Sequence, residues 1–503
     1  MEGWIYRTLG HHQVFPPKMK IFKEIMSSKT ISEVKRAGRL PWFALGGALV
    51  LAITVRLLLL SFLHHNYFLT GITVAEGEMA YHLARGRGFV INPSHMNKVA
   101  EQQNRIERLV DIMDVPSPEK EVLEPYHHAL PGYALLLSFF YRVTGKARYL
   151  ELQIFQAILD SIGVFLVYIL TRRTLGSTSI GIISAYLYAL WIPQARLSIA
   201  PLHDAPMAFL LLLSTLIFFE GEKKNSKGLM ALSAVLLGLS AYIRSDYIFL
   251  PAFFAVAAFI KRARGEKRAL MLINGFWMVC LVFLILLPWG LRNYVTFHRF
   301  TILRPVLWQS IWEGFGEFSN PFGAVLDDKV AFEMVQKEHP KISYFDPEYQ
   351  EILRNKSLKA IKEHPEWFIM MLPRRFLRML FAVNDWGFLP ESNFSSFKAK
   401  GGGFLDYLST TDSLQIFLRV VRRIVENGLV FMALAGLILL RKRWRYLTIL
   451  LSVPACGFLM HLPIYWEPRY LLPGNFPFLI LAGVAIEAIY QRAKTLHSEA
   501  CRE

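Results

Sequence analysis

The chain is poor in cysteine and in charge. Of its three cysteines, Cys280 and Cys456 lie in apolar runs and Cys501 lies near the C-terminal end. No two of them share a loop, so the sequence predicts neither a disulfide framework nor a cysteine metal site. Charged residues make up 19% of the chain, whereas soluble domains average about 25%. The low charge indicates a chain that spends much of its length in a bilayer.

The motifs of common soluble enzymes are also missing. The sequence has no Walker loop, no Gly-x-Gly-x-x-Gly after a strand, no His-Glu-x-x-His and no serine-nucleophile motif. No polar stretch is long enough for a nucleotide-binding domain. An enzyme of this kind must therefore take its activated substrate from the membrane. We expect no cofactor, and the sequence has no cysteine or histidine spacing typical of a metal site. Binding of a divalent metal is an alternative that stays open.

Long apolar runs are what the chain does have. Hydrophobic residues make up 53% of it, and runs close to the ~20 residues that cross a bilayer recur. The runs are continuous rather than alternating, which favours helices over a barrel. We predict an all-α polytopic membrane protein. The apolar runs cover residues 42–63, 131–143, 151–171, 178–192, 205–219, 229–243, 247–260, 269–289, 425–440, 446–462 and 470–490.

The basic residues assign the sides. The net charge of +17 fits the positive-inside rule, because Lys and Arg cluster beside spans, and we expect no nucleic-acid partner. Basic segments are placed on the cytoplasmic side; they are 171–176, 223–227, 261–268 and 441–445. The expected organisation is a cytoplasmic basic arm (1–41), a transmembrane domain (42–490) with outer loops 64–128 and 290–424, and a cytoplasmic tail (491–503).

Two segments are expected to lie along the membrane instead of crossing it. Residues 131–143 are short, and the parity of the spans leaves no crossing for them, so we predict a re-entrant or interfacial helix. Residues 349–381 are amphipathic at first and apolar after Pro365, which predicts an interfacial helix on the outer face.

Ionisable residues then gather on the outer side. The chain comes back to that side in five segments, and each segment carries an ionisable residue beside an apolar span. A charged side chain there is costly unless it pairs with another charge or lines a wet cavity. We therefore predict a cavity that faces outward and is lined by acids and arginines. The stretches are 76–78, 196–204, 243–246, 288–294, 383–388 and 465–470.

Three acids are candidates for chemistry. Glu76 and Glu78 lie about 200° apart on a helix, so at most one faces a cavity. A helix starting near Glu78 and ending at Gly86 or Gly88 would make these acids first-turn stabilisers; the alternative is a general base. Asp204 precedes Ala-Pro and an apolar span, which fits an N-cap as well as a site residue.

Three outer arginines are candidates for binding phosphate, because Arg forms bidentate pairs with phosphate or carboxylate. Arg244 has Asp246 nearby and Arg469 has Glu467 nearby, so a simple ion pair is the alternative interpretation of each. Arg292 has no acid within several residues, which favours it as a phosphate ligand.

The order of several stretches resembles integral-membrane GT-C glycosyltransferases of the protein-mannosyltransferase and aminoarabinose-transferase group. The stretches that carry the resemblance are "GRGF" with "NP" (86–93), "PGYALLLSFFYRVTG" (131–145), "FQAILDSIGVFLVYILTRRTLG" (155–176), "RLSIAPLHDAPMAFLLLL" (196–213), "PWGLRNY" (288–294) and "EPRYLLPGNFPFLILAG" (467–483).

The resemblance implies a bundle of about 11–13 helices with juxtamembrane helices in the first outer loop. It implies transfer of a sugar from a polyprenyl-phosphate carrier to a hydroxyl of a protein, lipid or glycan, with inversion. Because no retention signal is visible in the sequence, we expect a bacterial inner membrane. The family's first-loop acid maps onto Glu78, with Glu76 in reserve, and its second-loop acid onto Asp204. The family often has an Asp-Glu pair there, whereas this chain has Glu-Gly-Glu.

Residues beside these positions complete the expected site. Arg292, and after it Arg469 and Arg244, are expected at the donor phosphate, and Tyr81, His203 and Glu467 at the substrate. Two other classes of function stay open: a transporter or flippase of a lipid-linked saccharide, and a non-catalytic membrane scaffold. Within the enzyme class, a ligase or polymerase with a longer lipid-linked donor is the alternative.

Overall fold

The computed structural model describes most of the chain. The described residues are 40–63, 71–92, 123–262, 266–342, 344, 346–381, 413–465 and 467–501. Several predicted features lie outside these residues. They are nearly all of the basic arm, the greater part of the stretch between 93 and 127, the 383–388 candidate, and Trp466.

The fold is all-α and polytopic, as predicted. Among the described residues, five helices have the length and apolar composition to cross a membrane. They are α3 (Leu40–Leu63), α8 (Leu150–Leu175), α11 (Asp204–Lys224), α14 (Glu266–Phe297) and α24 (Phe476–Ala500). The bundle is completed by α9 (Thr178–Leu190), α12 (Lys227–Ile243), α13 (Leu250–Lys261), α21 (Ser413–Leu439) and α22 (Trp444–His461). Helices satisfy their own backbone hydrogen bonds, which lipid requires.

The surface of this bundle is apolar where lipid would cover it. Large side chains on α3 and α14 are exposed, among them Phe43, Phe62, Phe276 and Trp277 at 63–75%. The largest apolar cluster of the interior joins α8, α11, α12, α13 and α22. An apolar exterior around an apolar interior is expected of a protein whose solvent is the bilayer.

Short elements connect the bundle and form its first outer loop. That loop holds α4 (Gly71–Ala84), an antiparallel pair of two-residue strands, β1 (Val90–Ile91) and β2 (Glu124–Pro125), and α7 (Pro131–Thr144). At 14 residues, α7 is about 21 Å long, shorter than the ~30 Å hydrocarbon core. The other short elements are α10 (Ile192–Ile199), η1 (Ser245–Tyr247), η2 (Arg441–Arg443), α23 (Pro468–Leu471) and η3 (Leu472–Gly474).

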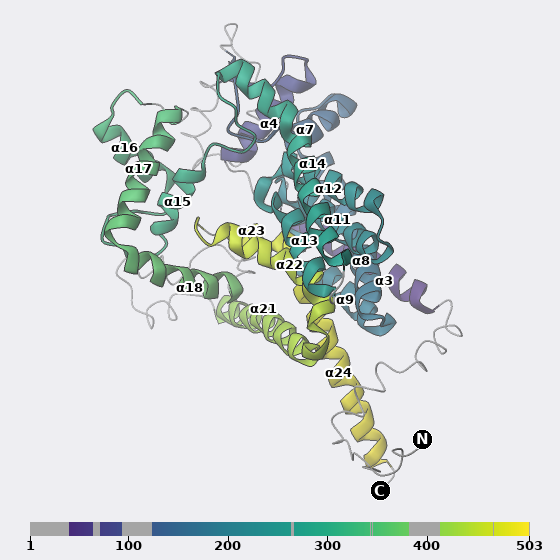
Figure 1. The fold of residues 1–503 in the computed structure, drawn as a ribbon. Helices are drawn as coiled ribbons and strands as arrows, with labels where there is room; N and C mark the ends of the chain where they lie inside the picture. The colour runs from purple at the N-terminus through teal and green to yellow at the C-terminus, as the bar shows by residue number, and fades with distance from the viewer. Residues whose placement is uncertain are drawn as a thin grey trace, which may run out of the picture.

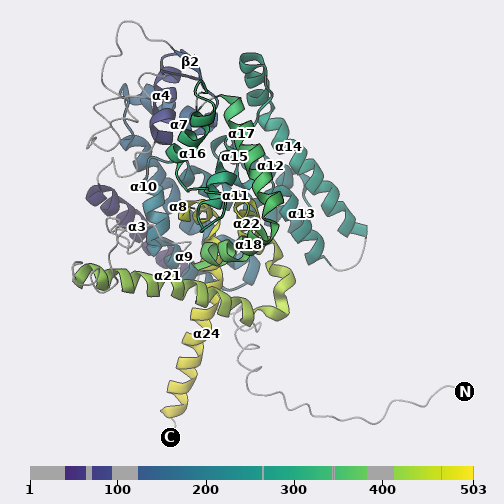
Figure 2. The same cartoon turned by 90° about the vertical axis from the view of Figure 1, so that its left-hand side faces the viewer.

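The four helices after α14 form a separate unit, which we call the outer unit after the side predicted for it. They are α15 (Leu307–Phe315), α16 (Asp328–Glu338), α17 (Pro347–Glu363) and α18 (Pro365–Phe381), and they share an aromatic-rich cluster around Trp312 and Phe315. In Figure 1 and in the turned view of Figure 2, α15, α16 and α17 lie toward the same end of the molecule as α4 and α7. Arg375 of α18 anchors the unit with its guanidinium on Gly314, Glu317 and Leu462.

The prediction of a single helix over 349–381 is wrong. The segment forms α17 and α18, which are separated at His364 and Pro365. Proline disfavours helical backbone in the residue before it but suits the first turn of the next helix. The break lets α17 pack on α15 inside the outer unit while α18 continues past it.

The basic clusters meet at one end of the bundle, as the parity of the spans predicts. Glu222 of α11 lies 2.5 Å from the Lys261 amine and 3.1 Å from Arg262. Glu220 lies 3.2 Å from Arg173 at the end of α8. The C-terminal end of α24 points away from α4 and α7 in both views.

Candidate active site

The two first-loop acids lie in the middle of a helix. The expectation that a helix starts near Glu78 is wrong, because α4 begins at Gly71. Its expected end is confirmed: Gly86 and Gly88 follow it with φ of 75° and 86°, a backbone that glycine adopts without strain. Glu76 and Glu78 are 2% and 3% exposed, so neither is a first-turn acid that stabilises a helix end in water.

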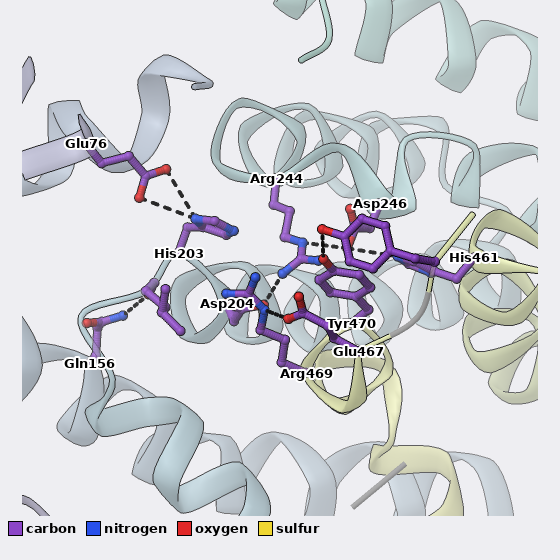
Figure 3. A network of polar contacts seen from close by, with 12 residues as sticks. Glu76, Gln156, His203, Asp204, Arg244, Asp246, His461, Glu467, Arg469 and Tyr470 are labelled. Carbon is purple, nitrogen blue, oxygen red and sulfur yellow. Dashed lines mark hydrogen bonds and ion pairs between the residues drawn. The ribbon is translucent and has the colours of Figure 1, made fainter. Parts of the chain in front are cut away.

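The two carboxylates face different partners, as a 200° separation requires. Both oxygens of Glu76 lie within 3.4 Å of Nδ1 of His203, which comes from the second outer loop (Figure 3). Glu78 accepts a hydrogen bond of 2.6 Å from the backbone N–H of Asn92, just after β1. His82 also lies near Glu78, at 3.7 Å. Glu76 thus faces the bundle, and Glu78 faces the strand pair.

Two buried amides of α8 hold the loop that carries His203 and Asp204. Gln153 and Gln156 donate to the carbonyls of Ile199 and Leu202, both at 2.7 Å. Such contacts satisfy backbone groups that α10 leaves open at its end. The loop is therefore positioned by a neighbouring transmembrane helix as well as by its own residues.

Asp204 starts α11 and pairs across the bundle. Its side chain is 0% exposed, and one oxygen accepts from Arg244 at the end of α12. Arg244 also lies 2.5 Å from Asp246, so the expected Arg244–Asp246 pair is confirmed and extended to a second acid. The N-cap interpretation of Asp204 is wrong, because His203 holds the N-cap position and Asp204 is the first residue of α11.

The network continues into the last outer return (Figure 3). Asp246 lies 3.3 Å from Nε2 of His461, and His461 stacks on Tyr470 with ring centroids 5.1 Å apart. The guanidinium of Arg244 lies 4.4 Å from the centre of the Tyr470 ring. Arg469 pairs with Glu467 at 2.5 Å, as expected from their spacing. Although burial alone would raise the pKa of Asp246, Arg244 and His461 hold it below its ordinary value.

Arg292 contacts the strand pair. Its guanidinium donates to the carbonyls of Tyr126 and Phe89 at 3.0 Å each, and to Asn293 at 2.9 Å. It also lies 4.9 Å from the centre of the Trp289 ring. Arg292 thus lies on the same side as Glu78, and both contact backbone groups in or beside the β1–β2 pair.

The remaining predicted residues are placed around this centre. Tyr81 is half-buried on α4, and the guanidinium of Arg85 lies 3.4 Å from its ring centre. Sequence reasoning missed His461 and Tyr470, which complete the network, and Gln153 and Gln156. Nothing in the sequence marks a histidine at the end of an apolar helix, or an amide within one, as part of a site.

The comparisons with known proteins agree with this picture over part of the chain. Residues 127–290 match the family described as dolichyl-phosphate-mannose-protein mannosyltransferase. The match includes Asp204, Arg244 and Asp246 and leaves out Glu76, Glu78 and Arg469. No curated protein matches the chain in sequence.

Solved structures of an archaeal oligosaccharyltransferase are similar in shape. The AglB enzyme from Archaeoglobus fulgidus, in complex with an inhibitory peptide and a dolichol-phosphate, is 14% identical with a TM-score of 0.47. The comparison covers 93% of this chain and 52% of that one. The Archaeoglobus fulgidus oligosaccharyltransferase with zinc and sulfate is 13% identical, with a TM-score of 0.44 and coverage of 90% and 49%.

This chain spans about half the length of those structures. The expected resemblance rests on the family match, which begins just before α7 and ends within α14. The chain is an integral membrane protein by the length and composition of its apolar helices, and its residues 127–290 are similar to the dolichyl-phosphate-mannose-protein mannosyltransferase family.

Proposed function

We propose that this protein is a glycosyltransferase that moves a sugar from a polyprenyl-phosphate carrier to a hydroxyl acceptor, with inversion at the anomeric carbon. The observation that carries the proposal is the meeting of four chain returns in one buried polar network. Glu76, His203, Asp204, Arg244 and Arg469 come from segments far apart in sequence and lie together in Figure 3. Buried charges at this density are costly in free energy unless they pair with one another or with a substrate.

In this proposal, Glu78 is the general base. A base must lie within reach of the proton that it takes from the acceptor hydroxyl. Glu78 faces the strand pair, which reaches the outer unit, whereas both oxygens of Glu76 contact His203. Glu76 then has the task of orienting the second loop through His203. The proton of the acceptor passes to Glu78 as the hydroxyl oxygen bonds to the anomeric carbon and the carrier phosphate leaves.

The arginines supply positive charge for the carrier phosphate. Arg469 is the preferred ligand in the proposal, because the structure pairs it with Glu467, whose side chain is 39% exposed. Arg244 is held by two acids and orients Asp204. Arg292 holds the strand pair and contributes charge nearby. A phosphate that departs with its charge already stabilised needs no further proton.

The base is tested by Glu78→Gln and Glu76→Gln in purified protein. Loss of a general base slows the chemical step by about 10²–10⁴-fold, so Glu78→Gln should lose transfer from a polyprenyl-phospho-sugar in that range. Glu76→Gln should lose less. The measurement is transfer of radiolabelled sugar in nanodiscs, after a thermal-unfolding check that both variants fold.

A substitution at the far end of the bundle gives the control. Glu220→Gln changes the same kind of side chain at the basic end of the bundle and should leave transfer unchanged. Full activity of Glu78→Gln would remove Glu78 as the base. Movement of the lipid-linked saccharide across vesicles without any transfer would favour a transporter instead.

A further inference from the structure

A cavity of about 490 Å³ lies between the first outer loop and the outer unit. Ile91 and Tyr126 line it from the β1–β2 side, and Phe297, Arg299 and Asp346 line it from the end of α14 and the start of α17. None of the residues in the polar network of Figure 3 lines it. The volume lies within the range of about 300–1,000 Å³ that is typical of small-molecule sites.

The cavity borders the proposed base. Ile91 lines the cavity, and the backbone N–H of the next residue, Asn92, donates to Glu78. Tyr126 lies near the same carboxylates: burial raises the pKa of its phenol to about 12, Arg304 opposes the rise, and Glu76 and Glu78 add to it. Arg292 holds the carbonyl of Tyr126 from behind. A molecule in the cavity would therefore contact Ile91, one residue before the backbone N–H that donates to Glu78.

The lining combines flat rings with polar groups. The His127 ring lies 4.2 Å from the ring of Phe297, measured between centroids. Burial, with Arg292 and Arg299, lowers the pKa of His127 to about 4, so its imidazole is neutral at neutral pH. Asp346 and Gln350 bring a carboxylate and an amide to the other wall. Aromatic rings provide flat faces for the C–H groups of a sugar. Carboxylates accept hydrogen bonds from its hydroxyl groups, and side-chain amides both donate to and accept from them.

The same region disfavours one other occupant. An extended peptide would need a strand edge with free donors, but β2 is two residues long and one of them is Pro125, which has no N–H. A saccharide does not need a strand edge.

We propose that this cavity is a saccharide-binding subsite that holds a sugar unit of the acceptor beside Glu78. The inference rests on the proposed glycosyl transfer for its role, and it adds the class of acceptor: the receiving hydroxyl belongs to a glycan or a glycolipid headgroup.

The test is direct binding of disaccharides to the full chain in nanodiscs by saturation-transfer NMR. The probes are mannobiose, diacetylchitobiose and maltose, with the peptide acetyl-Ala-Ser-Thr-Ala-amide for comparison. We expect at least one disaccharide to bind with a Kd of about 0.1–10 mM, and the peptide not to compete with it. His127→Ala and Asp346→Asn should each weaken binding at least about fivefold.

The control is Glu363→Gln, which removes an acid from the same helix, α17, at a position exposed and outside the lining. It should change the Kd less than about twofold. No binding by any of the three disaccharides, displacement by the peptide, or equal effects of Glu363→Gln and Asp346→Asn would overturn the inference. Glu78→Gln should keep disaccharide binding, so a failed base and a failed subsite give different results.

Discussion

At the scale of single residues, the site depends on charges that are buried together. Asp204 is completely buried, and Arg244, which is 8% exposed, reaches both Asp204 and Asp246. A buried charge is stable here only because its partner is present, so removing one member leaves the other unpaired. Arg292 is the arginine that the sequence alone ranked first as a phosphate ligand. In the structure its guanidinium donates hydrogen bonds to two backbone carbonyls.

We predict that Arg244→Met destabilises the protein strongly. Leaving a buried carboxylate without its partner costs about 3–5 kcal/mol, which thermal unfolding in detergent would register as a lower Tm. Arg299→Met is the matched control, because Arg299 is 47% exposed and its pair with Glu348 is 3.5 Å long. Such a surface pair contributes only about 0–1 kcal/mol. Equal losses in the two variants would contradict the buried-pair interpretation.

At the scale of elements, the outer unit contains an acid pair that joins α15 to α16. Glu313 is 2% exposed, accepts from Gln309 at 2.8 Å and interacts with Asp328. Burial, and then the charge of Asp328, raises the pKa of Glu313 to about 8. Burial raises the pKa of Asp328 as well. A carboxyl group that stays protonated between two helices stabilises their contact only while it keeps its proton.

The outer unit should therefore lose stability as the pH rises. The ordinary pKa of Glu313 is 4.5 and its folded pKa is about 8, so its contribution is complete below 4.5 and is lost through 8. Glu313→Gln, which is permanently neutral, should flatten this dependence and stabilise the unit at pH 9 by roughly 1–3 kcal/mol. Thermal unfolding followed by tryptophan fluorescence between pH 5 and 9 measures it. Glu333→Gln on exposed α16 surface should leave the slope unchanged.

At the scale of the whole molecule, a buried ion pair and its hydrogen bonds tie four helices together. Arg56 of α3 lies 2.6 Å from Asp160 of α8, and Asp160 also accepts from Tyr188 of α9 and Gln194 of α10. Arg56 donates in addition to the carbonyl of Ala189. The network lies on the helices that precede the second outer loop, so it fixes the frame on which His203 and Asp204 are held.

We predict that Arg56→Leu alone is more harmful than Arg56→Leu with Asp160→Leu. The single variant leaves Asp160 buried and charged, at a cost of about 3–5 kcal/mol, whereas apolar replacement of both partners is often close to neutral. A double-mutant cycle on Tm in nanodiscs measures the coupling. If the double variant were less stable than Arg56→Leu by the full cost of Asp160→Leu, the two residues would not act as a pair.

The sequence by itself determined the class of fold, whereas the sides of the membrane that it assigns stay a prediction. Apolar length and the positions of Lys and Arg depend only on local composition, which is why the spans and the common end of the basic clusters were predictable. Helix ends with a local signal, such as Gly86 after α4, were also predictable. The start of α4 and the break at Pro365 were not, because the first is settled by packing and the second was outweighed by an amphipathic pattern.

Only the tertiary structure decided which ionisable residues share a site. Glu76 meets His203 across 127 positions, and Arg244 meets Asp204 across 40. Such pairings follow from how helices pack, which leaves no periodic trace in the chain. The same packing gave Glu76 and Glu78 their different partners, turned Arg292 toward the strand pair and placed a cavity near the segment that contacts Glu78.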